Sequence, residues 1–104
     1  MFRILVVEDD SKLRELILLN LRKWGFAAQG VEDFSKVMEA VEEQDPHLVL
    51  LDINLPMYDG FYWCRKIRST SNRPIIFISS RGANMDIVMA VNMGGDDFVS
   101  KPFS

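Results

Sequence analysis

The chain has 104 residues, of which 48% are hydrophobic and 26% are charged, a composition typical of a globular protein with an apolar core. Its 12 basic and 15 acidic residues give a net charge of -3, which argues against nucleic acid binding by this segment, because a surface that follows phosphates needs a basic excess. Apolar runs such as Leu48–Leu51 are far shorter than the roughly 18 residues of a membrane-spanning helix, and no secretory signal pattern follows Met1. We therefore expect a single domain over residues 1–104, located in the cytoplasm and away from the membrane.

Short apolar strands and amphipathic helices alternate along the first half of the chain. The run Arg3–Val7 is continuously apolar after its first residue, as expected for a strand that is buried on both faces. A long helix follows, with Asp10 or Ser11 as its cap and Gly25 as its stop signal. The next predicted elements are a strand over Ala27–Val31, a helix over Phe34–Glu43 and a strand over Leu48–Leu51.

The same alternation continues in the second half. It predicts a helix over Gly60–Arg68, a strand over Pro74–Ile78, a helix over Asn84–Met93 and a strand over Asp97–Ser100. Strands that alternate with helices predict a doubly wound α/β fold with a five-stranded parallel sheet in the order 2-1-3-4-5, as in flavodoxin-like proteins. The helix over Asn84–Met93 has almost no polar face, so its outer side is expected to meet a partner.

Polar residues follow the predicted strands at their carboxyl ends. Glu8 and Asp9 follow the first strand, Asp52 the third, Ser79 the fourth and Lys101 the fifth. Ligands bind at this edge of doubly wound sheets. Two carboxylates about 4 Å apart repel each other by about 4 kcal/mol at an effective dielectric constant near 20. A cation is therefore expected between Asp9 and Asp52, and the oxygen donors favour Mg²⁺.

The chemistry that fits this group is phosphoryl transfer to a carboxylate, which gives an aspartyl phosphate. Asp52 is the expected nucleophile because its strand is central, whereas the pair Glu8 and Asp9 is better suited to holding metal. Mg²⁺ and Lys101 would offset charge on the transferring oxygens, and the hydroxyl of Ser79 could donate a hydrogen bond to one of them. Acidic residues at strand ends can also be solvated helix caps, and this reading is the better one for Asp10.

Over its whole length the chain resembles a receiver domain of bacterial two-component response regulators. The segments that carry the resemblance are Ile4–Asp9, Leu50–Pro56, Asp59–Gly60, Phe77–Arg81, Gly94–Phe98 and Lys101–Phe103. The resemblance implies that Asp52 is phosphorylated and that Asp9 and Asp52 bind Mg²⁺ directly. It implies further that Glu8 acts through water and that Asn54 offers its backbone carbonyl.

The resemblance also implies a signalling switch that is not an enzyme in its own right. Lys101 would contact the phosphoryl group, Ser79 would be the switch hydroxyl and Phe98 the switch aromatic residue. The phosphoryl donor would be a sensor histidine kinase, because the chain's single histidine, His47, precedes the third strand and lies at the wrong end of the sheet. The helix over Asn84–Met93 and the strand over Asp97–Ser100 would form a homodimer surface.

Two segments resemble particular subfamilies. Gly94–Phe98 together with Lys101–Phe103 is similar to regulators that carry a winged-helix DNA-binding domain, so the expected output is transcription. Tyr58–Cys64 is similar to regulators of antimicrobial-peptide sensing in Gram-positive bacteria. The resemblance also implies a fifth helix, which this chain, ending at Ser104, would lack.

Three alternatives remain open. A Mg²⁺-dependent aspartyl-phosphate phosphohydrolase needs a general acid near the nucleophile, but Asn54 has no acidic proton to give. A flavin-binding domain needs a phosphate loop after the first strand, where Glu8 and Asp9 would repel phosphate. A receiver-like adaptor that is never phosphorylated is disfavoured by the intact set of acidic, hydroxyl and lysine residues.

Overall fold

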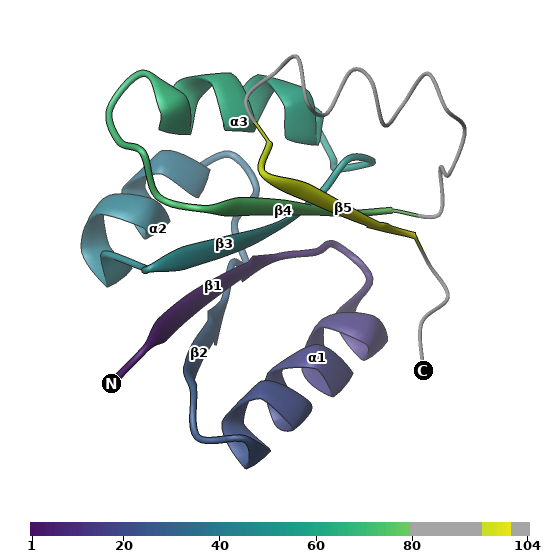
Figure 1. Ribbon diagram of the computed structural model, residues 1–104. Helices are drawn as coiled ribbons and strands as arrows, with labels where there is room; N and C mark the ends of the chain where they lie inside the picture. The colour runs from purple at the N-terminus through teal and green to yellow at the C-terminus, as the bar shows by residue number, and fades with distance from the viewer. Residues whose placement is uncertain (80–94, 101–104) are drawn as a thin grey trace.

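A computed structural model describes residues 1–79 and 95–100, in which strands and helices alternate (Figure 1). The elements are β1 (Arg3–Val7), α1 (Ser11–Lys23), β2 (Ala27–Gly30), α2 (Val37–Gln44), β3 (Leu48–Asp52), α3 (Gly60–Arg68), β4 (Ile75–Ser79) and β5 (Asp97–Ser100). The predicted helix over Asn84–Met93 and the predicted site residue Lys101 lie outside the described residues.

The strands form one parallel five-stranded sheet in the order β2-β1-β3-β4-β5, which confirms the predicted fold class and strand order. Helices α2 and α3 cover one face of the sheet, and α1 covers the other (Figure 1). The chain moves outward from β1 to β2 and then returns to β3 on the other side of β1. The carboxyl ends of β1 and β3 therefore lie next to each other at the point where the strand order reverses.

Alternate residues of each central strand pack into two different cores. Leu5 and Val7 of β1 join the core beneath α2 and α3. Ile4 and Val6 join the core beneath α1. Because both faces of the sheet are covered, apolar residues are required at successive positions, which explains the unbroken apolar runs in the sequence.

The ends of α1 follow the predicted capping signals. The side chain of Asp10 accepts hydrogen bonds from the backbone N–H groups of Lys12 and Leu13, at 3.0 and 3.2 Å, so Asp10 is the N-cap. The helix ends at Lys23, and Gly25 adopts the left-handed conformation with φ +91°. The predicted cap and stop are both confirmed.

The predicted start of α2 is wrong by three residues, because the helix begins at Val37 and not at Phe34. The carboxylate of Asp33 accepts hydrogen bonds from the backbone N–H and the hydroxyl of Ser35, at 3.0 and 2.6 Å. The hydrogen bonds from Ser35 also lower the pKa of Asp33. This local turn competes with the helix for the backbone groups, although Phe34 continues the apolar spacing.

Asp96 fixes the place where the chain enters β5. Its carboxylate accepts hydrogen bonds from the Arg68 guanidinium at 2.5 Å and from the backbone N–H of Ile75 at 2.7 Å. Its own N–H donates to the carbonyl of Ile75 at 2.8 Å. The start of β5 is thereby tied to β4 and to the last turn of α3. Among the helices that the structure describes, none has the length and apolar character needed to cross a membrane.

Candidate functional site

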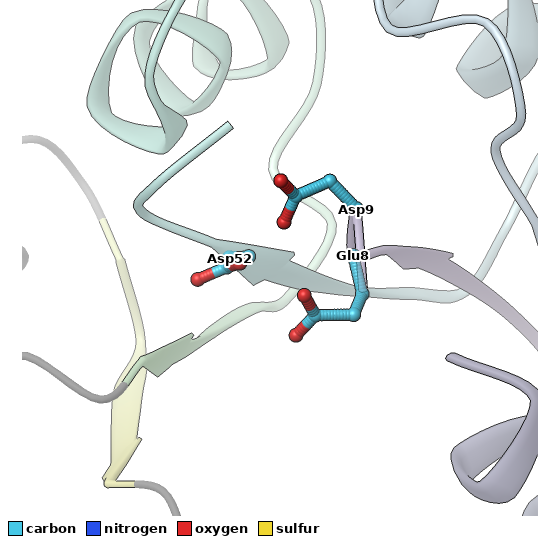
Figure 2. Close-up of side chains that lie close together, drawn as sticks. All are labelled: Glu8, Asp9 and Asp52. Carbon is cyan, nitrogen blue, oxygen red and sulfur yellow. The ribbon is translucent and has the colours of Figure 1, made fainter. Parts of the chain in front are cut away.

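Three carboxylates meet at the carboxyl ends of β1 and β3 (Figure 2). Glu8 and Asp9 follow β1 directly, and Asp52 is the last residue of β3. The register pairs Val7 with Leu51, so the two strands deliver their acidic residues at the same level. One carboxylate oxygen from each residue lies within 4.8 Å of the others. The structure therefore brings together the three acidic residues that the sequence predicted as a group.

The burial of this cluster favours a bound cation. Glu8 and Asp52 are buried, whereas Asp9 is exposed. The carboxylate of Glu8 accepts a hydrogen bond from the backbone N–H of Asp10 at 3.1 Å, which orients it. Carboxylates taken out of water lose solvation, and carboxylates close to one another repel. A divalent ion with a preference for oxygen offsets both costs, and one exposed carboxylate leaves an open side for water and a substrate, as Mg²⁺ requires.

Ser79 and the last residue of β5 lie at the carboxyl ends of their strands, on the same side of the sheet as the acidic cluster. Asp52 is in register with Ile78, so the buried Ser79 follows one position beyond it on the neighbouring strand. Ser79 is in turn in register with Ser100, the last residue of β5. Lys101, the next residue, lies outside the described part of the chain. Phe98 is in β5, in register with Phe77.

The loop over residues 53–59 connects Asp52 to α3 and carries the exposed Asn54. The N–H of Gly60 donates to the carbonyl of Ile53 at 2.8 Å, which closes the loop. A Cβ atom at Gly60 would lie 2.2 Å from the backbone oxygen of Asp52, so a side chain cannot be accommodated there. Asp59 caps α3 by accepting a hydrogen bond from the N–H of Tyr62 at 2.9 Å. The Asp-Gly pair thus holds the start of α3 against the strand that ends in Asp52.

Sequence reasoning missed the close packing at Gly60 and the ring of Tyr58, which stacks on Tyr62 with centroids 4.2 Å apart. The sequence contained a signal for each. Asp59–Gly60 is one of the segments that carry the family resemblance, but the sequence gives no distance between Gly60 and Asp52. Tyr58 and Tyr62 are four positions apart at the start of a helix, and rings at this spacing can meet.

Two further side chains that can be reactive, those of His47 and Cys64, have structural surroundings in this fold. His47 lies just before β3, at the edge of the sheet opposite Asp52, and its Nδ1 accepts a hydrogen bond from the backbone N–H of Arg3 at 2.8 Å. Cys64 is a residue of α3 and is completely buried. Burial raises the pKa of the Cys64 thiol to about 11, so the thiol is protonated at neutral pH.

Comparison with known families gives one match over nearly the whole chain. Residues 4–104 match the family described as the response regulator receiver domain. The response regulator protein GraR of Staphylococcus aureus strain NCTC 8325 is 52% identical to this chain over 101 residues, which are 97% of the chain and 45% of GraR. The chain thus spans about half the length of the curated relatives that it matches.

Solved structures give the same relationship. The N-terminal domain of the nisin resistance regulator NsrR, described as a lantibiotic response regulator, has a TM-score of 0.90 and 44% identity, over 100% of this chain and 88% of that chain. The BeF₃-activated receiver domain of Klebsiella pneumoniae RstA has a TM-score of 0.94 and 31% identity, over 98% of this chain and 87% of that chain.

Proposed function

The chain belongs to the response regulator receiver domain family, and from this premise we propose that Asp52 accepts the phosphoryl group that switches its signalling state. The observation that carries this proposal is the cluster of Glu8, Asp9 and Asp52 at the carboxyl ends of two central strands. Asp52 is the member at the end of the central strand β3. We also propose that residues 1–104 act as one domain.

Receiver domains are signalling proteins that sensor histidine kinases phosphorylate. In the proposed step, a carboxylate oxygen of Asp52 attacks the phosphorus of a phosphohistidine on the kinase. The P–N bond breaks, its electrons go to the departing imidazole, which takes up a proton, and an acyl phosphate forms on Asp52. The structural role of His47 supports a donor from outside the chain, because His47 lies at the opposite edge of the sheet.

Receiver domains bind Mg²⁺ at an acidic pocket, and the acidic cluster of this chain supplies suitable oxygen donors. We propose that Asp9 and Asp52 would hold the ion directly, Glu8 through water and Asn54 through its backbone carbonyl. When bound, Mg²⁺ supplies positive charge that offsets the charge on the transferring oxygens. The hydrogen bond from the N–H of Asp10 holds the Glu8 carboxylate toward this site.

The proposed switch runs from Ser79 to the surface that includes β5. The Ser79 hydroxyl would donate a hydrogen bond to the phosphoryl group on the adjacent strand, and Lys101 would pair with its charge. Movement of Ser79 would favour a second position of Phe98, which lies in the strand paired with β4. This couples the charge on Asp52 to the surface of β5.

The partners of the whole protein are part of the same proposal. They are a sensor histidine kinase, a second copy of the receiver domain, and a transcriptional output through a DNA-binding domain. The similarity to the nisin resistance regulator NsrR supports a stimulus of the antimicrobial-peptide class. Phosphoryl donors of this kind are made with ATP, so the proposal places the chain in the cytoplasm.

Intact mass after incubation with acetyl phosphate tests the proposal. We expect a gain of about 80 Da, one phosphoryl group, that requires both Mg²⁺ and Asp52. Asp52→Asn keeps the shape of the side chain and removes the nucleophilic oxygen, so this variant should show no gain. Asp10→Asn is the matched control, because it makes the same chemical change at an exposed cap outside the cluster.

Labelling of Asp52→Asn equal to that of the unchanged chain would refute the assignment of Asp52. A folded chain that gains no mass under any condition would favour the adaptor. Rapid release of phosphate with turnover, without an accumulated adduct, would favour the phosphohydrolase.

A further inference from the structure

The loop over residues 53–59 is held at both ends but bends sharply between them. The carbonyl of Ile53 accepts a hydrogen bond from the N–H of Gly60, and the carboxylate of Asp59 accepts one from the N–H of Tyr62. Between these points, Met57 adopts φ +70°, a left-handed conformation that L side chains rarely adopt. Met57 is 73% exposed, so its own packing does little to hold this conformation.

The ring of Tyr58, the next residue, is held by an aromatic platform on α3. It stacks on Tyr62 with centroids 4.2 Å apart and planes 14° apart, and it meets Trp63 edge-on at 5.8 Å. Trp63 is part of the buried core, and Tyr62 packs against that core. The Nζ atom of Lys66 lies 5.6 Å from the centroid of the Tyr62 ring. The platform is therefore fixed independently of the loop.

We propose that Tyr58 is a positioning residue for the acidic pocket. The stacked ring of Tyr58 holds the 53–59 loop in the conformation that presents the backbone carbonyl of Asn54 to the metal. Tyr58 is 47% exposed and is not part of the buried core. Its stacking offsets the unfavourable conformation of Met57, the residue next to it. Without the ring, the backbone of Met57 can leave its left-handed conformation. Asn54 is only three residues away in the same loop, so its backbone carbonyl would be displaced as well.

This inference rests on the proposed function through Asn54, but its main consequence can be measured without phosphorylation. In the metal-free chain, loss of the stack should open the loop more often. An aromatic pair of this kind changes such an opening equilibrium by about 3- to 10-fold. The N–H of Gly60 is protected by its hydrogen bond to the carbonyl of Ile53, which closes the loop. We therefore expect the amide hydrogen of Gly60 to exchange faster by this factor in Tyr58→Ala.

The second measurement is the Mg²⁺ dissociation constant, determined by isothermal titration calorimetry with MgCl₂ alone. Tyr58→Ala should raise it by about 3- to 10-fold, because the loop must be ordered again each time the ion binds. Tyr58→Phe keeps the stacked ring and should restore both the exchange rates and the affinity. If Tyr58→Ala does not fold, Tyr58→Leu gives the same comparison, because it keeps an apolar side chain without a ring.

Phe26→Ala is the matched control. Phe26 is a partly exposed aromatic residue that meets Phe2 edge-on at 5.8 Å, just before β2 and far from the acidic cluster. Loss of the Phe26 ring should lower the free energy of unfolding of the whole chain and leave the Mg²⁺ dissociation constant unchanged. This separates local positioning by Tyr58 from a general loss of stability.

Three outcomes would overturn the inference: unchanged exchange and affinity in folded Tyr58→Ala, failure of Tyr58→Phe to restore them, or equal weakening in Phe26→Ala. The proposed function fails in a different way. In that case the unchanged chain gains no phosphoryl group, and Asp52→Asn binds Mg²⁺ as the unchanged chain does. Faster exchange in Tyr58→Ala would then still show that the ring holds the loop.

Discussion

Burial controls the chemistry of the Cys64 thiol. Desolvation on the buried side of α3 raises its pKa to about 11, from an ordinary value of 9.0, so the folded chain holds the thiol in its neutral form. Two pH units correspond to about 100-fold less thiolate at pH 8 in the folded chain than in the unfolded chain. We therefore expect iodoacetamide to modify Cys64 at least that much more slowly in the native chain than in urea. Mass spectrometry at timed intervals measures both rates.

The same shift has a consequence for stability. Because the unfolded thiol ionises at a lower pH than the folded one, Cys64 favours the folded state below pH 9 and loses this contribution as the pH rises toward 11. Cys64→Ala should remove that part of the alkaline decline. Equal modification rates in native and unfolded samples would contradict the buried position.

At the scale of elements, the packing of α3 against the end of β3 depends on one missing side chain. In Gly60→Ala the new Cβ would meet the backbone oxygen of Asp52 at 2.2 Å, and neither backbone can move without disturbing the sheet. We expect the free energy of unfolding to fall by about 1–3 kcal/mol, the usual cost of overpacking, as measured by urea denaturation. Mg²⁺ binding should weaken as well, because Asp52 is displaced.

Gly30→Ala is the control for this substitution. Its Cβ would lie 2.9 Å from the Cδ atom of Arg14, and this side-chain atom can shift by a few tenths of an ångström more easily than backbone can, even while the guanidinium donates to the carbonyl of Glu8. Its cost should therefore be under about 1 kcal/mol. If the two variants lost equal stability, the rigid contact between Gly60 and Asp52 would not be the cause.

Strand order and the acidic cluster could be predicted because each follows from a local pattern and a general rule. Glu8 and Asp52 end apolar runs, and parallel strands place such ends at one edge of the sheet. The start of α2 could not be predicted from apolar spacing, since the turn around Asp33 and Ser35 competes for the same backbone groups. The contact at Gly60 depends on the distance between two elements, which no local pattern contains.

At the scale of the whole molecule, the described helices divide between the two faces of the sheet. Helices α2 and α3 cover one face and α1 covers the other (Figure 1). Beside α1 is an apolar groove of about 470 Å³. Its lining residues are Leu13, Leu16, Ile17, Asn20, Leu21, Trp24, Leu50, Ile76, Ile78 and Val99. The groove includes part of β5, the strand that the sequence assigned to a dimer surface.

Exposed apolar side chains make this face the expected site of self-association. Leu16 and Trp24, which both line the groove, are 55% and 78% exposed. Because such patches drive association when they are contiguous, we expect the 104-residue chain to form dimers in a concentration-dependent way. Sedimentation equilibrium over a wide concentration range measures this, and Leu16→Glu should weaken the association by burying a charge at the contact.

Met57→Glu is the control that separates association through this face from non-specific association. Met57 is at least as exposed as Leu16 but does not line the groove, and its loop leads into α3 on the other face of the sheet, so its replacement should leave the association unchanged. If both variants dissociate equally, the contact is non-specific. A mass that stays monomeric at the highest concentration would contradict the prediction of self-association through this groove, since it rests on the preference of an apolar surface for contact over water.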